Sequence, residues 1–337
     1  MKDKFPIHIS IIDKELSYTM ELIHKVTIIQ DLSASGKTTL IDTINEYNLG
    51  SSYIKIKSNF HCQVINTNIW EPIVSNTSNM IYFIDEDIIS VIDSKFYEKI
   101  RKTNNYYVII NRSSDVGFDF SVDQIYRFEI NNGEHKLVRK FNPEELIGKY
   151  VKSGMEIILS EDSKSGLDMW NSIFNLPCIT TNGNRGIVKK VLQNNNHMLI
   201  FDTLGFGRYI NNLVTVVDKN SKNTILLGIP SLEYLIVSSN ILKLNCHELS
   251  NVESNLKIEG ISREQFYFKY LVQLTKNNSK LRYSKKKLNE GYLNKDNLQK
   301  IVDKLEDMFK YDFSKYIKIN NNKEEFSGNI IDYFNWD

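Results

Sequence analysis

Two hydrophobic periods alternate along this chain. Short runs in which almost every position is apolar, among them KVTIIQ, MIYFI and YYVIIN, have the length and isoleucine content of fully buried strands. Stretches with apolar residues at helical spacing follow such runs. This alternation predicts an α/β fold in which a parallel sheet is covered by helices on both faces.

The first part of the chain predicts a hairpin, HISIIDKE followed by YTMELIH, ahead of the strand KVTIIQ. A helix over about 37–46 comes next, then the extended segment YIKIKS, the strand MIYFI, the helix SKFYEKIRKT and the strand YYVIIN. The strands QIYRFEI and EHKLVRKF close this part. Residues 141–154 combine Pro, Gly and charge without a strand period, so a domain boundary is expected there.

A second alternating series begins at MEIILS. It continues with the helix SKSGLDMWNSIF, the strand PCITT, the helix RGIVKKVLQ, the strand HMLIFD, the helix GRYINNLVTVV and the strand NTILLGI. From about residue 263 the pattern is helical in REQFYFKYLVQLT, SKKKLNEGYL and KDNLQKIVDKLEDMFKY, and the aromatic residues of NIIDYFNWD indicate a docked tail. We therefore expect a first domain over 1–142, a second α/β domain over 155–240 and a mainly helical region over 241–337.

Composition narrows the class of protein. The 337 residues are 41% hydrophobic and 25% charged, and the net charge of +1 means that any nucleic-acid contact must come from local patches. No run approaches the length of a membrane-spanning helix, so no membrane partner is expected. The isolated cysteines Cys62, Cys178 and Cys246 lack the paired spacing of zinc sites or disulfides and favour a reducing, cytoplasmic location. The six histidines form no ligand spacing and receive no role.

The loop after KVTIIQ carries the first candidate chemistry. It ends in Gly-Lys-Thr at the start of a predicted helix, where backbone N–H groups and the helix N-terminus form a cradle for anions. In such a loop Lys37 would reach the β- and γ-phosphates of a nucleotide, and Thr38 would bind magnesium. The predicted nucleotide-binding residues are Ser33, Ala34, Ser35, Gly36, Lys37, Thr38 and Thr39.

Asp31 stands where a phosphate-binding loop normally begins with glycine. Its carboxylate would repel phosphate, yet aspartate tolerates left-handed turn conformations better than most residues. We expect nucleotide binding that is weakened or altered rather than absent. The alternative is an ordinary helix N-terminus without a ligand.

The strand MIYFI is followed directly by the acids Asp85 and Glu86, the arrangement called Walker B. Asp85 would hold magnesium through water, and Glu86 would polarise the attacking water. Asn111, at the end of the next strand, would orient that water, and it completes the predicted nucleotide site. We expect the strands of the two motifs to be neighbours. The alternative is that both strands simply run into polar loops.

Together these motifs resemble compact AAA-like or other small P-loop ATPases over residues 7–141. The segment between the motifs is too short for the helical insertion of a transporter-type ATPase and contains no LSGG-like signature. The resemblance implies a P-loop NTPase domain that binds ATP and Mg2+ and hydrolyses ATP. A helical lid of the AAA type is not visible in the sequence.

The second series places acids at the ends of two of its strands. Glu161 follows the first of them, and Asp202 ends the third. Because ligands collect at the carboxyl ends of strands in open α/β sheets, these acids would converge, bind magnesium and support phosphodiester chemistry as catalytic residues. The alternative is that each acid caps a helix.

This order of acids resembles the Toprim domain over residues 156–236, where a Glu follows strand one and Asp-x-Asp follows strand three. The second Asp of that pair is Leu204 here, and the Gly usual after the Glu is Asp162. Glu233, after the fourth strand, stands where acids also occur in Toprim nucleases. The resemblance implies a Rossmann-like domain with metal-dependent nuclease activity.

An ATP-binding domain joined to a Toprim-like domain is similar in architecture to OLD-family and related antiphage effectors. The resemblance implies an ATPase that controls a domain acting on or binding nucleic acid in antiviral defence, as a homo-oligomer or with a partner protein. The basic stretch around Tyr283, SKLRYSKKKLNEGYL, would offer a further nucleic-acid contact, and the alternative, which the mixed charges of KIVDKLEDMF favour, is a solvated helix face. The alternatives are a nucleotide-dependent switch or scaffold without nuclease activity and, less favoured, a small-molecule phosphotransferase that uses the loop alone.

Overall fold

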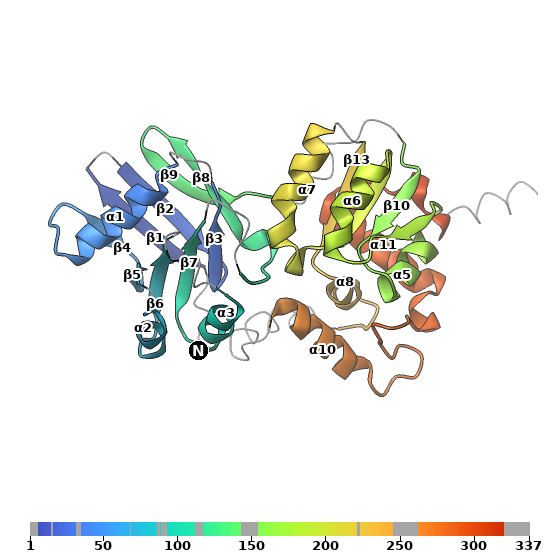
Figure 1. Ribbon diagram of the computed structural model, residues 1–337. Coiled ribbons are helices and arrows are strands. Elements are labelled where there is room, and N and C mark those ends of the chain that lie inside the picture. Colours follow the sequence, from blue (N-terminus) through green and yellow to red (C-terminus); the bar gives the residue numbers. More distant parts are fainter. Residues whose placement is uncertain are drawn as a thin grey trace, which may run out of the picture. The chain divides into compact units, whose positions relative to one another are not determined.

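The computed structural model describes residues 6–14, 16–31, 35–67, 69–85, 88, 93–111, 117–142, 154–220, 223–244 and 262–319 (Figure 1). These residues form two compact units, of which the first holds those up to Asn142 and the second holds nearly all that follow. Among the described residues, no helix combines the length and the apolarity that crossing a bilayer requires.

One nine-stranded sheet organises the first unit, in the order β4-β1-β2-β9-β8-β3-β7-β6-β5. The strands from β8 to β5 are parallel, whereas β1 pairs antiparallel with β2 and β4, and β8 pairs antiparallel with β9. The predicted hairpin is confirmed by the pairing of β1 with β2, and β2 also pairs parallel with β9, so the sheet is mixed rather than wholly parallel. The strands are β1 (Ile7–Asp13), β2 (Leu16–Leu22), β3 (Val26–Ile29), β4 (Lys55–Lys57), β5 (His61–Ile65), β6 (Met80–Ile84), β7 (Tyr106–Ile110), β8 (Ile125–Asn131) and β9 (Glu134–Arg139).

Helices cover the two faces of this sheet unequally. On one face α1 (Lys37–Asn48) buries Leu40, Ile41 and Ile44 in a core that extends from β1 to β5. On the other face Phe96 packs edge-on against Tyr107. Over β1, β2 and β9 that second face carries polar side chains instead, so the predicted cover on both faces is wrong there. The remaining helices are α2 (Glu71–Ser75), α3 (Ser94–Lys102) and the 3-10 helix η2 (Val122–Gln124).

The second unit contains a four-stranded sheet in the order β11-β10-β12-β13, and all its neighbouring strands are parallel. The apolar runs of β10, β12 and β13 are almost wholly buried, as the sequence pattern predicts for such a sheet, whereas the edge strand β11 exposes Ile179. The strands are β10 (Ile157–Ser160), β11 (Cys178–Thr180), β12 (His197–Asp202) and β13 (Thr224–Ile229). The helices are α5 (Ser165–Ile173), α6 (Asn184–Gln193), α7 (Gly207–Lys219), α8 (Leu232–Ser238), α10 (Arg263–Thr275) and α11 (Lys295–Phe309), with the 3-10 helices η3 (Thr203–Gly205), η4 (Glu290–Tyr292) and η5 (Ser314–Tyr316).

Alternate residues of these strands point to opposite faces of the sheet. Ile158 and Met198 share one core with Trp170 of α5 and with buried residues of α8, α10 and α11. Ile187 of α6 and Leu213 of α7 are also fully buried but lie outside that core. The second sheet is therefore covered on both faces, and the C-terminal helices complete one of its two layers.

The segment SKKKLNEGYL differs from its prediction as a helix, because its only helical part is the short η4. The Asn289 side chain accepts a hydrogen bond from the Gly291 N–H, which favours a tight turn. A Cβ at Gly291 would lie 1.8 Å from the carbonyl oxygen of Lys280, so the chain folds back on itself here. The predicted docked tail, NIIDYFNWD, lies outside the described residues.

Candidate functional site

Three candidate segments of the nucleotide site follow β3, β7 and β6, at the carboxyl ends of parallel strands. The phosphate loop follows β3, Asn111 follows β7 and Asp85 follows β6. Because β7 lies between β3 and β6, the expectation that the two motif strands are neighbours is wrong. Asn111 stands on the strand between the motifs, and its backbone N–H donates to the Ile29 carbonyl oxygen over 3.0 Å.

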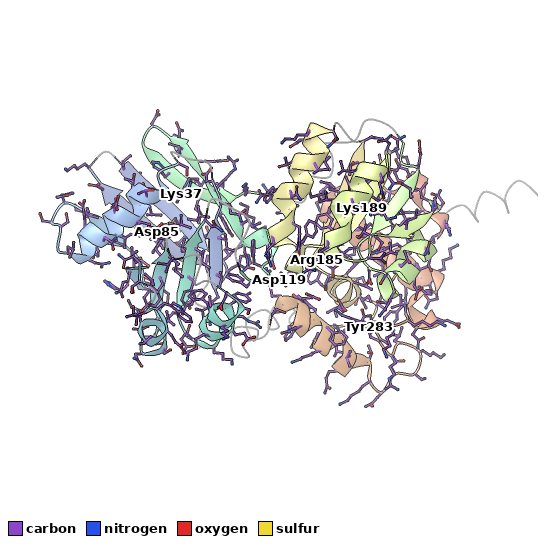
Figure 2. The ribbon with its side chains drawn as sticks, in the orientation of Figure 1. Lys37, Asp85, Asp119, Arg185, Lys189 and Tyr283 are labelled. Atoms are coloured by element: carbon purple, nitrogen blue, oxygen red, sulfur yellow. The ribbon has the colours of Figure 1, made fainter. Side chains whose placement is uncertain are left out.

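The phosphate loop ends at Gly36, whose left-handed conformation, with φ of 79°, leads into α1. Lys37 is the first residue of this helix and is only 6% exposed (Figure 2). Its ammonium donates to the Ser35 hydroxyl over 2.7 Å and to the Asp31 carbonyl oxygen over 3.1 Å. Thr38 and Thr39 are exposed on the first turn, whereas Ser33 and Ala34 lie outside the described residues.

Asp31, the unusual first residue of the loop, makes a specific structural contact. Its carboxylate accepts a hydrogen bond from the Phe128 N–H of β8 over 3.0 Å. The preceding residue, Gln30, donates its own N–H to the Tyr126 carbonyl oxygen over 2.9 Å. The carboxylate therefore extends the pairing between β3 and β8 by one further bond and holds the start of the loop against the sheet.

Two aromatic side chains of the sheet lie directly against Gly36. The Tyr18 hydroxyl donates to the Gly36 carbonyl oxygen over 2.9 Å, and burial raises the pKa of Tyr18 to about 12. The His135 ring stacks on Tyr18 with 4.7 Å between ring centroids. A Cβ at Gly36 would lie 2.6 Å from His135 Nε2, so close packing as well as backbone conformation requires glycine here.

The sequence patterns did not single out Tyr18 or His135. Both belong to hairpins that precede or follow the motifs, and only the pairing of β2 with β9 brings them together beneath the loop. Asp85, the predicted magnesium ligand, is half-buried at the end of β6, and Figure 2 labels it. Glu86, the predicted base, lies outside the described residues.

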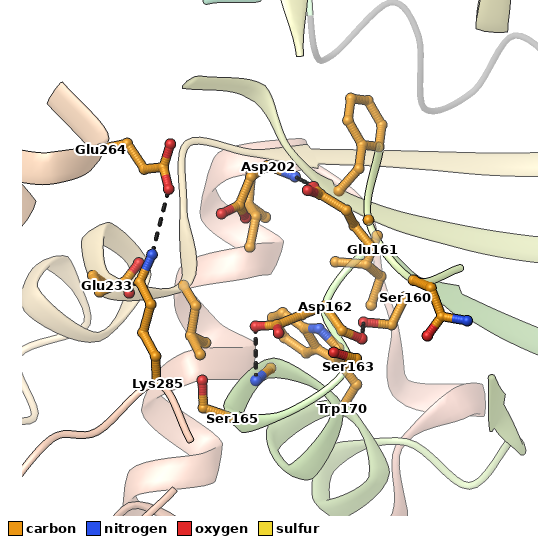
Figure 3. A pocket seen from close by; sticks show the side chains of 17 residues that line it. Ser160, Glu161, Asp162, Ser163, Ser165, Trp170, Asp202, Glu233, Glu264 and Lys285 are labelled. Atoms are coloured by element: carbon orange, nitrogen blue, oxygen red, sulfur yellow. Dashed lines mark hydrogen bonds and ion pairs between the residues drawn. The ribbon is translucent and has the colours of Figure 1, made fainter. Parts of the chain in front are cut away.

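Glu161 and Asp202 are brought together in the second unit. Their strands, β10 and β12, are parallel neighbours, and the Glu161 N–H donates to the Ile200 carbonyl oxygen over 2.9 Å. The Asp202 N–H donates to Glu161 Oε2 over 2.7 Å (Figure 3). Glu161 and Asp202 therefore lie next to each other at the carboxyl ends of these strands, as expected from the sequence.

A cavity of about 350 Å³ opens beside this pair. Asp162 also lines it, but this carboxylate accepts hydrogen bonds from the Gly166 N–H over 3.0 Å and the Lys164 N–H over 3.3 Å, and so caps α5. The cavity thus concentrates negative charge from several elements (Figure 3). Its carboxylates are Glu161, Asp162, Asp202, Glu233 and Glu264, and its lysine is Lys285.

Glu233 lies in the first turn of α8 and is only 2% exposed. Its carboxylate accepts a hydrogen bond from the Tyr283 hydroxyl over 2.9 Å and lies 3.7 Å from the Lys285 ammonium. Lys285 also lies 3.4 Å from Glu264 of α10. Tyr283 is buried, so it does not offer the exposed ring that nucleic-acid stacking at the basic stretch would require. No sequence spacing could have linked Glu264 and Lys285 to the strand ends.

The crowding of carboxylates changes their protonation. Burial raises the pKa of Glu161 to about 7, and the neighbouring Asp162 and Glu264 add to this effect, which the Asp202 N–H and Lys285 oppose. Burial, followed by repulsion from Glu161, also raises the pKa of Asp202. Burial disfavours the charged form of Lys285, but Glu233 and Glu264 outweigh it and raise the pKa of this ammonium. The cavity therefore holds more negative charge than one lysine balances.

This excess charge suits a divalent cation, because Mg2+ is commonly bound by one or two carboxylates and otherwise keeps its waters. Among the described residues, however, no three His, Cys, Asp or Glu side chains already stand together as a metal-binding group. Leu204, in place of the second acid of the Toprim pattern, is buried in η3. Glu161 and Asp202 thus fit a cation held by two protein ligands and water.

No protein-family model matches this sequence, and no curated protein matches it at a significant level.

Proposed function

We propose that this protein binds ATP with Mg2+ at the loop between β3 and α1, and that the bound nucleotide controls a Toprim-like second unit that acts on nucleic acid. One observation carries the nucleotide site: the loop, Asn111 and Asp85 follow parallel strands of one sheet, and Lys37 begins the helix behind the loop. In open α/β sheets this edge is where ligands bind.

Lys37 is well placed to exchange partners when a phosphate arrives. Its ammonium is buried, and two of its contacts, with the Ser35 hydroxyl and the Asp31 carbonyl, are to uncharged oxygens. A phosphate oxygen would form a stronger, charge-assisted bond with the same ammonium. The N–H groups of the first turn of α1, behind the left-handed Gly36, would add donors to the phosphate chain.

Magnesium would neutralise the developing charge on the phosphates during hydrolysis. In this protein Thr38 and Asp85 would hold it, and Asn111 would orient the attacking water from the strand between them. Glu86, directly after Asp85, would accept the proton of that water. The Asp31 carboxylate is engaged by the Phe128 N–H, which reduces the repulsion that its charge would exert on phosphate.

The second unit supports metal-dependent cleavage of a phosphodiester. Glu161 and Asp202 would hold Mg2+ at adjoining strand ends, where burial raises the pKa of Glu161 to about 7 and a bound cation would favour its charged form. Glu161 would also keep its contact with the Asp202 N–H, which fixes the orientation of one carboxylate. A role in antiviral defence, through nucleotide control of this cleavage, is part of the proposal.

A nucleotide-dependent switch without nuclease activity is the second candidate. The buried Leu204, where the Toprim pattern carries an acid, favours it because two-metal cleavage needs that additional ligand. Assays of the intact protein with plasmid DNA and with RNA distinguish the two candidate functions. Mg2+-dependent cleavage selects the nuclease, whereas ATP turnover with no cleavage of either substrate selects the switch.

Lys37→Ala tests the nucleotide site. We expect the dissociation constant for ATP with Mg2+, measured by isothermal titration calorimetry, to rise at least about tenfold because a buried charge-assisted bond to phosphate is lost. Lys55→Ala, an exposed lysine of β4, is the matched control and should bind ATP as the wild type does. Failure of the wild-type protein to bind any nucleoside triphosphate would refute the proposal.

A further inference from the structure

Positive charge is concentrated in the segment between α10 and η4. Six of the twelve residues 276–287 are lysine or arginine, and none is acidic. All six of these side chains are exposed. Because the chain as a whole carries a net charge of only +1, this basic segment creates a positive potential that is local to one surface of the second unit.

Buried side chains hold the basic segment in one conformation. Tyr283 is buried, and its N–H donates to the Thr275 hydroxyl over 3.0 Å. The hydroxyl of Tyr292, which is also buried, donates to the Leu281 carbonyl oxygen over 2.5 Å. The backbone that carries the cations is therefore ordered before any ligand arrives, which reduces the entropy lost on binding.

The basic segment forms part of the wall of the carboxylate cavity. Lys285 lines this cavity, with its ammonium 3.4 Å from Glu264 and 3.7 Å from Glu233. The Tyr283 hydroxyl donates to the same Glu233 carboxylate over 2.9 Å. Figure 3 shows Lys285 reaching toward these acids. Two residues of the basic segment are thus anchored at the cavity that holds Glu161 and Asp202.

The cations next to these anchors are not engaged in the same way. Arg282 directly precedes Tyr283, and Lys286 and Lys287 directly follow Lys285. Among the described residues, the side chains of Arg282, Lys286 and Lys287 make no hydrogen bond or ion pair. The acids therefore face the cavity, whereas unpaired cations lie on the exposed surface beside it.

We propose that Arg282, Lys286 and Lys287 bind the phosphates of a nucleic-acid strand and hold it beside the carboxylate cavity. This inference rests on the proposed function, in which that cavity acts on the strand. Lysine and arginine contacts with phosphates supply most of the non-specific affinity for nucleic acid and position the strand. Because the ring of Tyr283 is buried and cannot stack on a base, binding should depend on charge rather than on sequence.

The triple variant Arg282→Ala/Lys286→Ala/Lys287→Ala tests the proposal. Binding of fluorescently labelled DNA and RNA is measured by anisotropy in EDTA, which prevents cleavage that depends on divalent cations. We expect the dissociation constant at about 50 mM salt to rise at least about tenfold. The slope of the logarithm of affinity against the logarithm of salt concentration should become shallower by about 2 to 3, since three phosphate contacts are lost.

Two further variants separate specific contacts from a change in total charge. Lys55→Ala/Lys57→Ala/Lys136→Ala removes the same charge from exposed lysines of the first unit and should bind nearly as the wild type does. Lys286→Arg/Lys287→Arg keeps the charge of the basic segment and should keep the dissociation constant within about twofold of the wild-type value. Equal losses of affinity in the two triple variants would overturn the assignment to this segment.

Unchanged affinity and salt dependence in the first triple variant would also overturn the role of the basic segment. If the wild type still cleaves nucleic acid with Mg2+, that result leaves the nuclease proposal standing. Loss of binding in the variant, with a wild type that cleaves neither DNA nor RNA, rejects the nuclease and supports the binding surface. A wild type that neither binds nor cleaves DNA or RNA overturns both. Binding to phosphatidylserine vesicles but not to nucleic acid would assign the segment to a membrane surface and overturn the inference.

Discussion

Glu161→Gln is expected to stabilise the protein at alkaline pH in the absence of divalent cations and to abolish its response to Mg2+. The pKa of Glu161 in the folded protein is about 7, well above the ordinary value near 4.3 of the unfolded chain. A carboxyl group with a raised folded-state pKa binds its proton more tightly in the folded protein, so stability falls as the pH rises from about 4.3 to about 7. Below this window the group contributes no penalty.

The size of this penalty follows from the difference in pKa. The difference corresponds to a loss of about 2 to 3 kcal/mol at pH 8, allowing for partial solvent access to the side chain. Glutamine cannot ionise, so the variant should lose the share of the pH dependence that Glu161 contributes. Chemical denaturation at pH 5 and pH 8 measures it: the wild type should lose more stability between pH 5 and pH 8 than the variant, which keeps only the part that the raised pKa of Asp202 causes.

Magnesium should reverse the effect in the wild type. A cation bound between Glu161 and Asp202 balances their charge and stabilises only the folded protein, so the free energy of unfolding at pH 8 should rise with Mg2+ concentration. Glu161→Gln should lose this rise together with any Mg2+-dependent cleavage. Glu156→Gln, an exposed residue before the same strand, is the control. If the stability of the wild type changes neither between pH 5 and pH 8 nor with Mg2+ concentration, Glu161 and Asp202 do not form a cation site.

The order of the first sheet shows what one sequence can and cannot predict. Buried strands such as β6 and β7 can be predicted because every position is apolar. The helix α1 can be predicted because it follows a phosphate-binding type of loop and its apolar residues recur at helical spacing. The insertion of β7 between β3 and β6 is not, since strand order depends on which helices cross which face. The strand β5, HCQVI, escaped prediction because its exposed His61 and half-buried Gln63 interrupt the apolar run.

Parts of the candidate sites could also be predicted from the sequence, and other parts could not. Glu161 and Asp202 could be predicted to meet because both follow strands of one parallel sheet, and strand ends share an edge. Glu264 and Lys285 reach that cavity from segments beyond the sheet, through the packing of α10 and the turn after it. His135 lies beneath Gly36 because a hairpin far along the chain pairs with β2. Such contacts depend on tertiary packing and leave no periodic signal in the sequence.

Gly36→Ala is expected to destabilise the first unit by about 3 kcal/mol and to abolish measurable ATP binding. Two separate costs add at this position. A φ of 79° costs an L-residue about 1 to 2 kcal/mol, and the new Cβ would lie 2.6 Å from His135 Nε2 and 3.1 Å from the Tyr18 hydroxyl oxygen. The His135 ring is buried and stacked on Tyr18, so relieving the clash displaces the loop that Lys37 anchors.

Gly50→Ala separates these two costs. Gly50 follows α1 with a φ of 95°, and nothing lies within 4 Å of the Cβ that the substitution adds. It should therefore cost only the conformational part, about 1 kcal/mol. Combining Gly36→Ala with His135→Ala should recover about 1 kcal/mol or more relative to the sum of the single variants, because the contact is removed. Equal losses in Gly36→Ala and Gly50→Ala, measured by chemical denaturation, would show that His135 does not restrict the loop, and the account of Gly36 as a packing glycine would be wrong.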